Sequence, residues 1–285
     1  MPPKRVDPLQ FLTDSTVAIV AGKGGVGKTT VTAVLARAAI RRGLRVLVIE
    51  LDGKPALSRL LPDVEVLHLS ATAALAEYLD THGLSLVTKR LASSGIIDVV
   101  ATASPGIDDI LVLGKIRQLE QSGRYDLVLV DGPAAGHAIT LLMSAKSMRT
   151  TMRSGPINSQ AVEAAAMLAD PARCQVILVT LPETTPMNEA VETAFAVEDR
   201  VGVHLGPIVV NGVDAGPALP ADAAPNGSPM RLAAEFRTAR RLLHQAACRD
   251  LGEMLALPQI ALSHVPGARL DPASVEALAD ELDPR

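Results

Sequence analysis

Residues 16–30, with the sequence TVAIVAGKGGVGKTT, decide the fold of this chain. The run Val17–Ala21 is entirely aliphatic or small and predicts a buried strand. The four glycines that follow predict a loop, and helical character begins near Thr29 and continues to Arg42. This order of strand, loop and helix, with the spacing G-x-x-x-x-G-K-[ST] from Gly22 to Thr29, predicts a phosphate-binding loop.

The chemistry of phosphate binding explains each residue type in this loop. Glycines let consecutive backbone N–H groups converge on phosphate oxygens, and the following helix adds the positive end of its dipole. Lys28 is expected to neutralise the β- and γ-phosphates of a nucleotide, and the Thr29 hydroxyl is suited to ligate Mg²⁺. The predicted nucleotide-binding residues of the loop are Gly22, Gly24, Gly25, Val26, Gly27, Lys28, Thr29 and Thr30.

Aliphatic runs and helical stretches alternate along the rest of the chain. The runs expected to form buried strands are Val17–Ala21, Arg45–Leu51, Ile97–Ala101, Asp126–Val130, Gln175–Thr180, Pro207–Asn211 and Pro258–Leu262. The helical stretches include Thr29–Arg42, Ile107–Gln121, Asn188–Asp199 and Met230–Leu257. This alternation predicts an α/β fold with a doubly wound, mostly parallel sheet, in one domain over residues 1–285. Together with the phosphate-binding loop it predicts a P-loop NTPase.

Two segments interrupt this pattern. Residues 215–229 are dense in Pro, Ala and Gly and predict a flexible surface loop. Residues 138–171 contain four of the eight methionines and predict a short helical excursion. Its methionines would either pack on the sheet or form an adaptable surface for a partner.

The composition excludes several function classes. Aromatic residues make up 2% of the chain and the net charge is −4, so no nucleic-acid partner is expected. Cys174 and Cys248 are isolated from each other, which excludes a thiolate zinc site and a Cys-x-x-Cys redox pair. Residues 1–15 lack the apolar core of a signal peptide, and no stretch approaches the roughly 18–20 apolar residues of a membrane span. We therefore expect a cytoplasmic protein without direct membrane insertion.

Two carboxylates follow predicted strands near the phosphate loop. Ligands of open α/β sheets bind at the carboxyl ends of the strands. Asp131 follows the run that ends at Val130 and is the second predicted magnesium residue. Asp52 follows the run that ends at Leu51 and is expected to orient the attacking water or to act through the magnesium shell. Glu50, one alternate residue back along that strand, is the rival for this role, and Asp52 is preferred.

A second lysine, Lys23, lies inside the loop and has no obvious partner among the phosphates bound by its own chain. It is either a solvated surface residue or a charge that reaches the nucleotide of a facing subunit. With Lys28, the segment KGGVGKT resembles the deviant Walker A loop of the ParA/MinD partitioning proteins and of the ArsA family of arsenite-pump and tail-anchored-protein-targeting ATPases. Members of these families work as nucleotide-sandwich dimers. The resemblance therefore implies a homodimer or a heterodimer with a paralogous ATPase.

Two further segments resemble the nucleotide switches of the ArsA family. Residues Asp131–His137, DGPAAGH, resemble switch II, and ParA and MinD proteins lack its Gly-His ending. This resemblance implies a loop that moves with the γ-phosphate, in which His137 either packs locally or relays the nucleotide state. Asp52 with Leu57–Ser58 resembles switch I, although residues 53–55 read Gly-Lys-Pro where the family has Pro-Ala-His.

The resemblance covers roughly Val17 to Leu282 and is closest to small, single-P-loop ArsA-like proteins. Val209–Asn211 resembles the strand whose terminal Asn binds adenine, and an amide can pair with the N6 and N7 edge of that base. The alternative is a turn-forming Asn before Gly212. By the same logic the loop from Ser263 to Gly267 would wall the base.

Departures from the family narrow the expected function. The chain has one ATPase half and isolated cysteines, so metalloid binding is not expected. Only residues 138–171 are available for the family's helical insertion, and there is no zinc clasp. One chain is therefore not expected to form a deep groove for a transmembrane helix, although a dimer could form a shorter one. The acidic helix expected over residues 272–282 lacks the basic face of a MinD-type membrane anchor.

The combined prediction is a dimeric ATPase that binds ATP and Mg²⁺, hydrolyses ATP and controls a partner or protein client through its switches. The predicted catalytic residues are Asp52, Lys23 and Lys28. Two alternatives remain: a non-hydrolysing nucleotide switch or scaffold subunit of a heterodimer, and a ParA- or MinD-like positioning ATPase.

Overall fold

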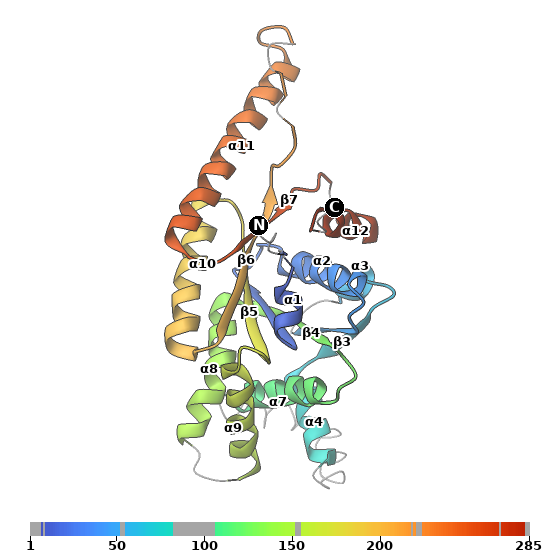
Figure 1. Ribbon diagram of the computed structural model, residues 1–285, viewed down its shortest axis with the longest axis vertical. Helices are drawn as coiled ribbons and strands as arrows, with labels where there is room; N and C mark the ends of the chain where they lie inside the picture. Colours follow the sequence, from blue (N-terminus) through green and yellow to red (C-terminus); the bar gives the residue numbers. More distant parts are fainter. Residues whose placement is uncertain are drawn as a thin grey trace, which may run out of the picture.

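One parallel sheet of seven strands organises the chain (Figure 1). The computed structural model describes residues 7, 9–51, 55–81, 106–151, 155–217, 219–220, 224–267 and 269–282. The strands are β1 (Val17–Gly22), β2 (Val46–Leu51), β3 (Glu65–Leu69), β4 (Leu127–Ala134), β5 (Cys174–Thr180), β6 (His204–Val213) and β7 (Gln259–Ser263). Their order is β3-β2-β4-β1-β5-β6-β7, and neighbouring strands pair in parallel. The predicted doubly wound α/β fold is therefore confirmed.

Helices cover both faces of this sheet (Figure 1). They are α1 (Phe11–Asp14), α2 (Lys28–Arg41), α3 (Leu57–Leu60), α4 (Ala71–Thr81), α7 (Ile107–Gln121), α8 (Ala135–Thr151), α9 (Pro156–Ala169), α10 (Thr184–Ala196), α11 (Pro229–Met254) and α12 (Pro272–Leu282). Residues from α1, α2, α3 and α12 share one hydrophobic core, and residues from α4, α7, α8, α9 and α10 share the other.

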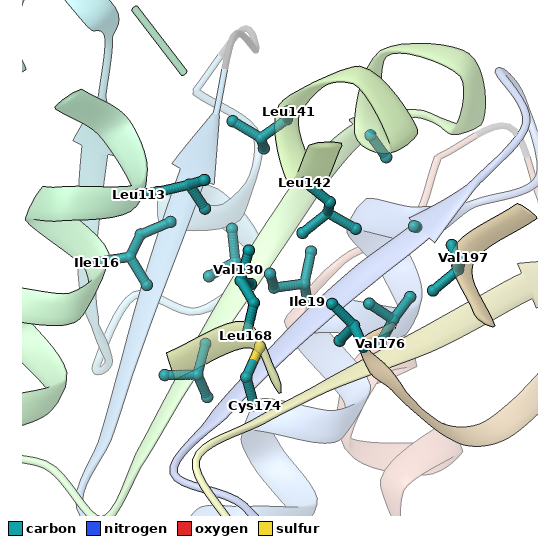
Figure 2. Packing of buried hydrophobic residues seen from close by; sticks show 14 of the residues in the cluster. Ile19, Leu113, Ile116, Val130, Leu141, Leu142, Leu168, Cys174, Val176 and Val197 are labelled. Atoms are coloured by element: carbon teal, nitrogen blue, oxygen red, sulfur yellow. The ribbon is translucent and has the colours of Figure 1, made fainter. Parts of the chain in front are cut away.

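Alternation along β1 separates the two cores. Ala18 and Val20 belong to the core on the side of α2, whereas Val17 and Ile19 belong to the opposite core, because successive side chains of a strand point to opposite faces. Figure 2 shows the second core, where the labelled residues are Ile19, Leu113, Ile116, Val130, Leu141, Leu142, Leu168, Cys174, Val176 and Val197. Aliphatic side chains thus fill the interior of a chain that has few aromatic residues.

The strand predictions differ from the structure in three places. β7, predicted as a buried strand, is exposed at alternate residues because it forms an edge of the sheet. β3 was not expected, because its sequence EVLHL is half polar; as an edge strand it is only partly buried and needs no continuous aliphatic run. The predicted strand Ile97–Ala101 lies outside the described residues.

The predicted switch II loop after Val130 is also wrong in its local structure. β4 continues to Ala134, which pairs with Gly22 of β1, and α8 begins at the next residue. Gly132 permits this extension because a Cβ atom there would lie 2.6 Å from the carbonyl oxygen of Val20.

The interrupting segments are also described in part. The predicted excursion over residues 138–171 consists of α8 and α9, and the described residues between 215 and 228 form no helix or strand. α11 then extends away from the sheet (Figure 1) for 26 residues, or about 39 Å at 1.5 Å per residue. No helix in the described part of the chain is long and apolar enough to cross a membrane.

Candidate nucleotide-binding site

The glycine-rich loop connects β1 to α2 at the centre of the sheet. Gly27 precedes the first helical residue with φ of 89°, in the left-handed region that favours glycine. A Cβ atom on Gly27 would lie 2.2 Å from Nδ2 of Asn211, and one on Gly22 would lie 2.4 Å from the carbonyl oxygen of Val179. Gly22 is therefore required by close packing against the backbone of β5, and Gly27 is favoured by its left-handed φ and by the nearby side chain of Asn211. The loop leaves the N-terminus of α2 available to bind an anion.

Lys28 starts α2 and turns its ammonium group back over the loop. Its Nζ donates a hydrogen bond to the carbonyl oxygen of Lys23 at 3.2 Å. Partial burial lowers the pKa of Lys28, and the negative charge of Asp131 opposes this effect. A cation is thus held at the loop close to a buried carboxylate.

Asp131 lies on β4 directly under the start of α2. Its Oδ2 accepts a hydrogen bond from Thr29 Oγ1 at 2.7 Å, and its Oδ1 accepts one from Thr32 Oγ1 at 3.4 Å. Burial raises the pKa of Asp131, while the bond from Thr29 and the charge of Lys28 act in the opposite direction. The structure therefore brings together both residues that the sequence predicted as magnesium ligands. Thr32, one helical turn after Thr29, was not predicted.

Glu50 is buried on β2 and pairs in register with Asp131 of β4. Its Oε1 accepts hydrogen bonds from the backbone N–H groups of Ala56 at 3.0 Å and Leu57 at 3.4 Å. Its Oε2 lies 3.7 Å from Nδ1 of His68. Glu50 thus holds the chain where it enters α3. Asp52, the preferred water-orienting residue, lies outside the described residues.

Lys23 has a partner within its own chain. Its ammonium group forms an ion pair with the carboxylate of Glu189 on α10, and both side chains are partly exposed. They line a pocket of about 430 Å³ together with residues of β4 and α8, including Ala134 and Gly136. The sequence predicted that the Lys23 side chain lies either in solvent or near the nucleotide of a facing subunit, and not in an ion pair within its own chain. The pairing was missed because Glu189 is 166 positions away, although α10 follows β5, the neighbour of β1.

Asn211 lies near the end of β6 and contacts the loop directly. Its Nδ2 donates a hydrogen bond to the carbonyl oxygen of Val26 at 2.9 Å. Beyond it, a pocket of about 490 Å³ lies between the end of β6, the loop after β7 and α11. Its lining residues are Val213, Asp214, Ala215, Gly216, Phe236, Arg237, Arg240, Ser263, His264 and Pro266. The loop predicted to wall a base thus does line a cavity close to Asn211.

His137 lies apart from these groups. It is exposed in the first turn of α8 and lines a separate pocket of about 320 Å³ with Asp108 and Pro133. Burial raises the pKa of Asp108. The described side chains give His137 no contact with Lys28 or Asp131.

Loop, helix N-terminus, lysine and buried hydroxyl–carboxylate pair together define a P-loop nucleotide-binding protein. The chain belongs to the family of the CobQ/CobB/MinD/ParA nucleotide binding domain, whose family model matches residues 17–256. The fold and family expected from the sequence are thereby confirmed.

Individual relatives are similar to this chain at low identity. ATPase BagA of Mycobacterium tuberculosis is 30% identical over 220 residues, which cover 68% of this chain and 64% of BagA. Arsenical pump-driving ATPases of Escherichia coli and Acidiphilium multivorum are 28% identical over 204 residues, which cover 68% of this chain and 34% of each relative. The chain thus spans less than two thirds of the length of the curated relatives it matches. These similarities support the resemblance to ArsA-type ATPases.

Proposed function

We propose that this chain is an ATPase that binds ATP with Mg²⁺ at the loop between β1 and α2 and hydrolyses it. The observation that carries the proposal is the convergence of Lys28, Thr29 and Asp131 on one site, with Thr29 bonded to Asp131 at 2.7 Å. The names of the relatives, which are called ATPases, support the same activity.

The residues at this site fit a magnesium ion. A threonine hydroxyl and a carboxylate are oxygen ligands of the kind Mg²⁺ prefers, and Asp131 is buried where an unpaired charge is unfavourable. Thr29 and Asp131 would hold the ion, directly or through water. When bound, Mg²⁺ supplies positive charge to the phosphates.

The chain's own residues would do the rest by position and charge. The loop N–H groups and Lys28 neutralise negative charge on the phosphates, and Asp52 orients the attacking water. Glu50 accepts two backbone hydrogen bonds through Oε1, whereas its Oε2 is buried without a hydrogen-bond partner among the described residues, so Glu50 is kept as the rival to Asp52. Asn211 would read the edge of adenine by exchanging its present hydrogen bond to the carbonyl oxygen of Val26 for one to the base, and the pocket that follows the end of β6 would hold the base.

We further propose that the active form is a dimer, of two copies or with a paralogous ATPase, in the cytoplasm. Lys23 would leave Glu189 and approach the nucleotide of the facing subunit, so each site would be complete only in the dimer. The nucleotide state would then control a partner or protein client.

A second candidate, a nucleotide switch without hydrolysis, is favoured by the same pairing of Lys23 with Glu189, which keeps that lysine away from any nucleotide. Steady-state ATP turnover and molecular mass with and without ATP separate the two. Turnover that is lost in Lys28→Ala and in Asp52→Asn supports the ATPase. ATP-dependent dimerisation without turnover supports the switch, and no ATP binding contradicts both.

A further inference from the structure

The helix α11 exposes a stripe of large apolar side chains. Leu232, Phe236, Leu243 and Met254 are 58%, 69%, 68% and 41% exposed. Their spacings of 4, 7 and 11 residues place them along one face of the helix. Only Ala234 and Leu251 of this helix are buried. Apolar residues gathered in this way, rather than scattered singly, mark an interaction surface.

Three members of this stripe line a groove between α10 and α11. The groove has a volume of about 590 Å³, and Phe236, Leu243 and Met254 form its α11 wall. Pro182 and Met187 contribute apolar atoms from the opposite side. The eighteen-residue interval from Phe236 to Met254 corresponds to about 27 Å along α11. The groove is therefore long enough to contact about five turns of a second helix.

The charged side chains of the groove leave an excess of negative charge. Arg240 lies 3.4 Å from Asp214, whose carboxylate also contacts Arg237 at 3.3 Å. In contrast, Glu183 and Asp250 line the groove and form no ion pair within the described part of the chain.

The remaining ionisable group of the groove is His244, whose Nδ1 accepts a hydrogen bond from the backbone N–H of Asp214 at 3.1 Å. Burial lowers its pKa and favours the neutral ring. Arg237, Arg240 and His244 together tie α11 to Asp214 at the end of β6, so the apolar wall is held in place before any partner binds.

We propose that this groove binds an amphipathic helix of a partner protein, with an apolar face and flanking Lys or Arg residues. The apolar face would cover Phe236 and Leu243, and its cations would pair with Glu183 and Asp250. In this binding mode an amphipathic helix lies in a hydrophobic groove and is recognised through the apolar side chains of one of its faces. An anionic membrane surface would be repelled by both carboxylates of the groove but attracted by Arg241 and Arg249 of the same helix, so vesicle binding is measured beside peptide binding.

Binding of a labelled synthetic helix to the whole chain tests this site. The probe is an eighteen-residue amphipathic peptide of Leu and Lys, compared with the same peptide carrying Glu in place of Lys, by fluorescence anisotropy. Leu243→Asp should weaken binding of the Lys peptide about tenfold or more, because a charge then replaces an apolar anchor. Leu242→Asp is the matched control, because Leu242 is 60% exposed but does not line the groove. The affinity of this variant for the Lys peptide should stay within about twofold of the wild type.

Charge supplies an independent readout. Asp250→Lys should weaken the Lys peptide and strengthen the Glu peptide, and Phe236→Ser should repeat the effect of Leu243→Asp. Thermal unfolding of each variant should match the wild type, because these side chains are exposed. Equal losses at Leu242 and Leu243, or equal binding of both peptides, would overturn the proposal. Self-association or binding to anionic vesicles that Leu243→Asp abolishes, without peptide binding, would assign the groove to a second copy or to a membrane instead.

Discussion

Thr29 and Asp131, 102 positions apart, meet at 2.7 Å where α2 begins above β4. The pair joins the first turn of α2 to the interior of β4, and Thr32 adds a longer hydrogen bond to the same carboxylate. Because Asp131 is buried and its pKa is raised, the folded chain without a cation holds an unfavourable negative charge there. A site that is strained in this way gains stability when a divalent cation binds.

Asp131→Asn should raise the thermal stability of the metal-free chain at neutral pH. The ordinary pKa is 3.8 and the folded value is higher, so protonation favours the folded state. That contribution is fully present below pH 3.8 and is lost as pH rises through the folded pKa. At neutral pH we therefore expect the variant to melt at a higher temperature than the wild type. Calorimetry with EDTA measures it.

Asp126→Asn is the control with the opposite sign. The Arg45 guanidinium holds the pKa of Asp126 down at about 2. Its contribution to stability is present above the ordinary pKa of 3.8 and is lost as pH falls towards 2. This exposed variant should therefore be no more stable than the wild type at neutral pH. An equal rise in melting temperature in both variants would show that burial of Asp131 is not the cause.

Glu189→Ala should free Lys23 for a facing subunit. We expect ATP turnover at low protein concentration to rise by about two- to fivefold, because the ion pair with Glu189 no longer competes. Lys23→Ala should abolish turnover while ATP binding changes little, since Lys28 remains. Glu192→Ala is the control, because Glu192 lines the same pocket without an ion pair to Lys23. If Glu189→Ala lowers turnover, Glu189 supports Lys23 rather than restraining it.

Gly27→Ala should disrupt the loop. Its φ of 89° and the 2.2 Å approach of Asn211 Nδ2 both oppose a Cβ atom. We therefore expect the free energy of unfolding to fall by roughly 1–3 kcal/mol and ATP binding to be lost. Gly24→Ala is the matched comparison, because a Cβ atom there meets nothing within 4 Å. Its unfolding midpoint in urea should match the wild type. Adding Asn211→Ala to Gly27→Ala should restore part of the lost stability.

Glu50→Gln and Asp52→Asn separate the two candidate water-orienting residues. A glutamine retains an oxygen that accepts from Ala56 and Leu57, so Glu50→Gln should keep most of its turnover. Asp52→Asn should lower kcat by about 100-fold or more with little change in KM for ATP. Steady-state kinetics at several ATP concentrations compare them. The reverse ranking would assign the role to Glu50.

Local sequence patterns predicted the parts of this molecule that local chemistry determines. The phosphate-binding loop is readable because strand, glycines, lysine and threonine must be consecutive for the backbone to surround a phosphate. Continuous aliphatic runs indicated the buried strands, whereas β3 was not predicted because an edge strand tolerates polar residues such as Glu65 and His68.

Contacts between distant segments could not be predicted in the same way. Glu189, the partner of Lys23, comes from α10, so that pairing depends on strand order rather than on spacing. Thr29 and Asp131 were both predicted to hold magnesium, but the hydrogen bond between them was not predicted. The stretch Met230–Leu257 was predicted as helical, but its periodicity does not show that α11 leaves Phe236 and Leu243 uncovered. The last residue of β4 and the first residue of α8 likewise depend on the pairing of Gly22 with Ala134.

The central claim is that Lys28, Thr29 and Asp131 form an ATP-hydrolysing site. Release of inorganic phosphate from ATP by the purified chain, with Mg²⁺ and with EDTA, tests it most directly when wild type and Lys28→Ala are compared at one protein concentration. We predict release that requires Mg²⁺ and falls by about 100-fold or more in Lys28→Ala. Release that persists at the wild-type rate in EDTA or in Lys28→Ala would contradict the account.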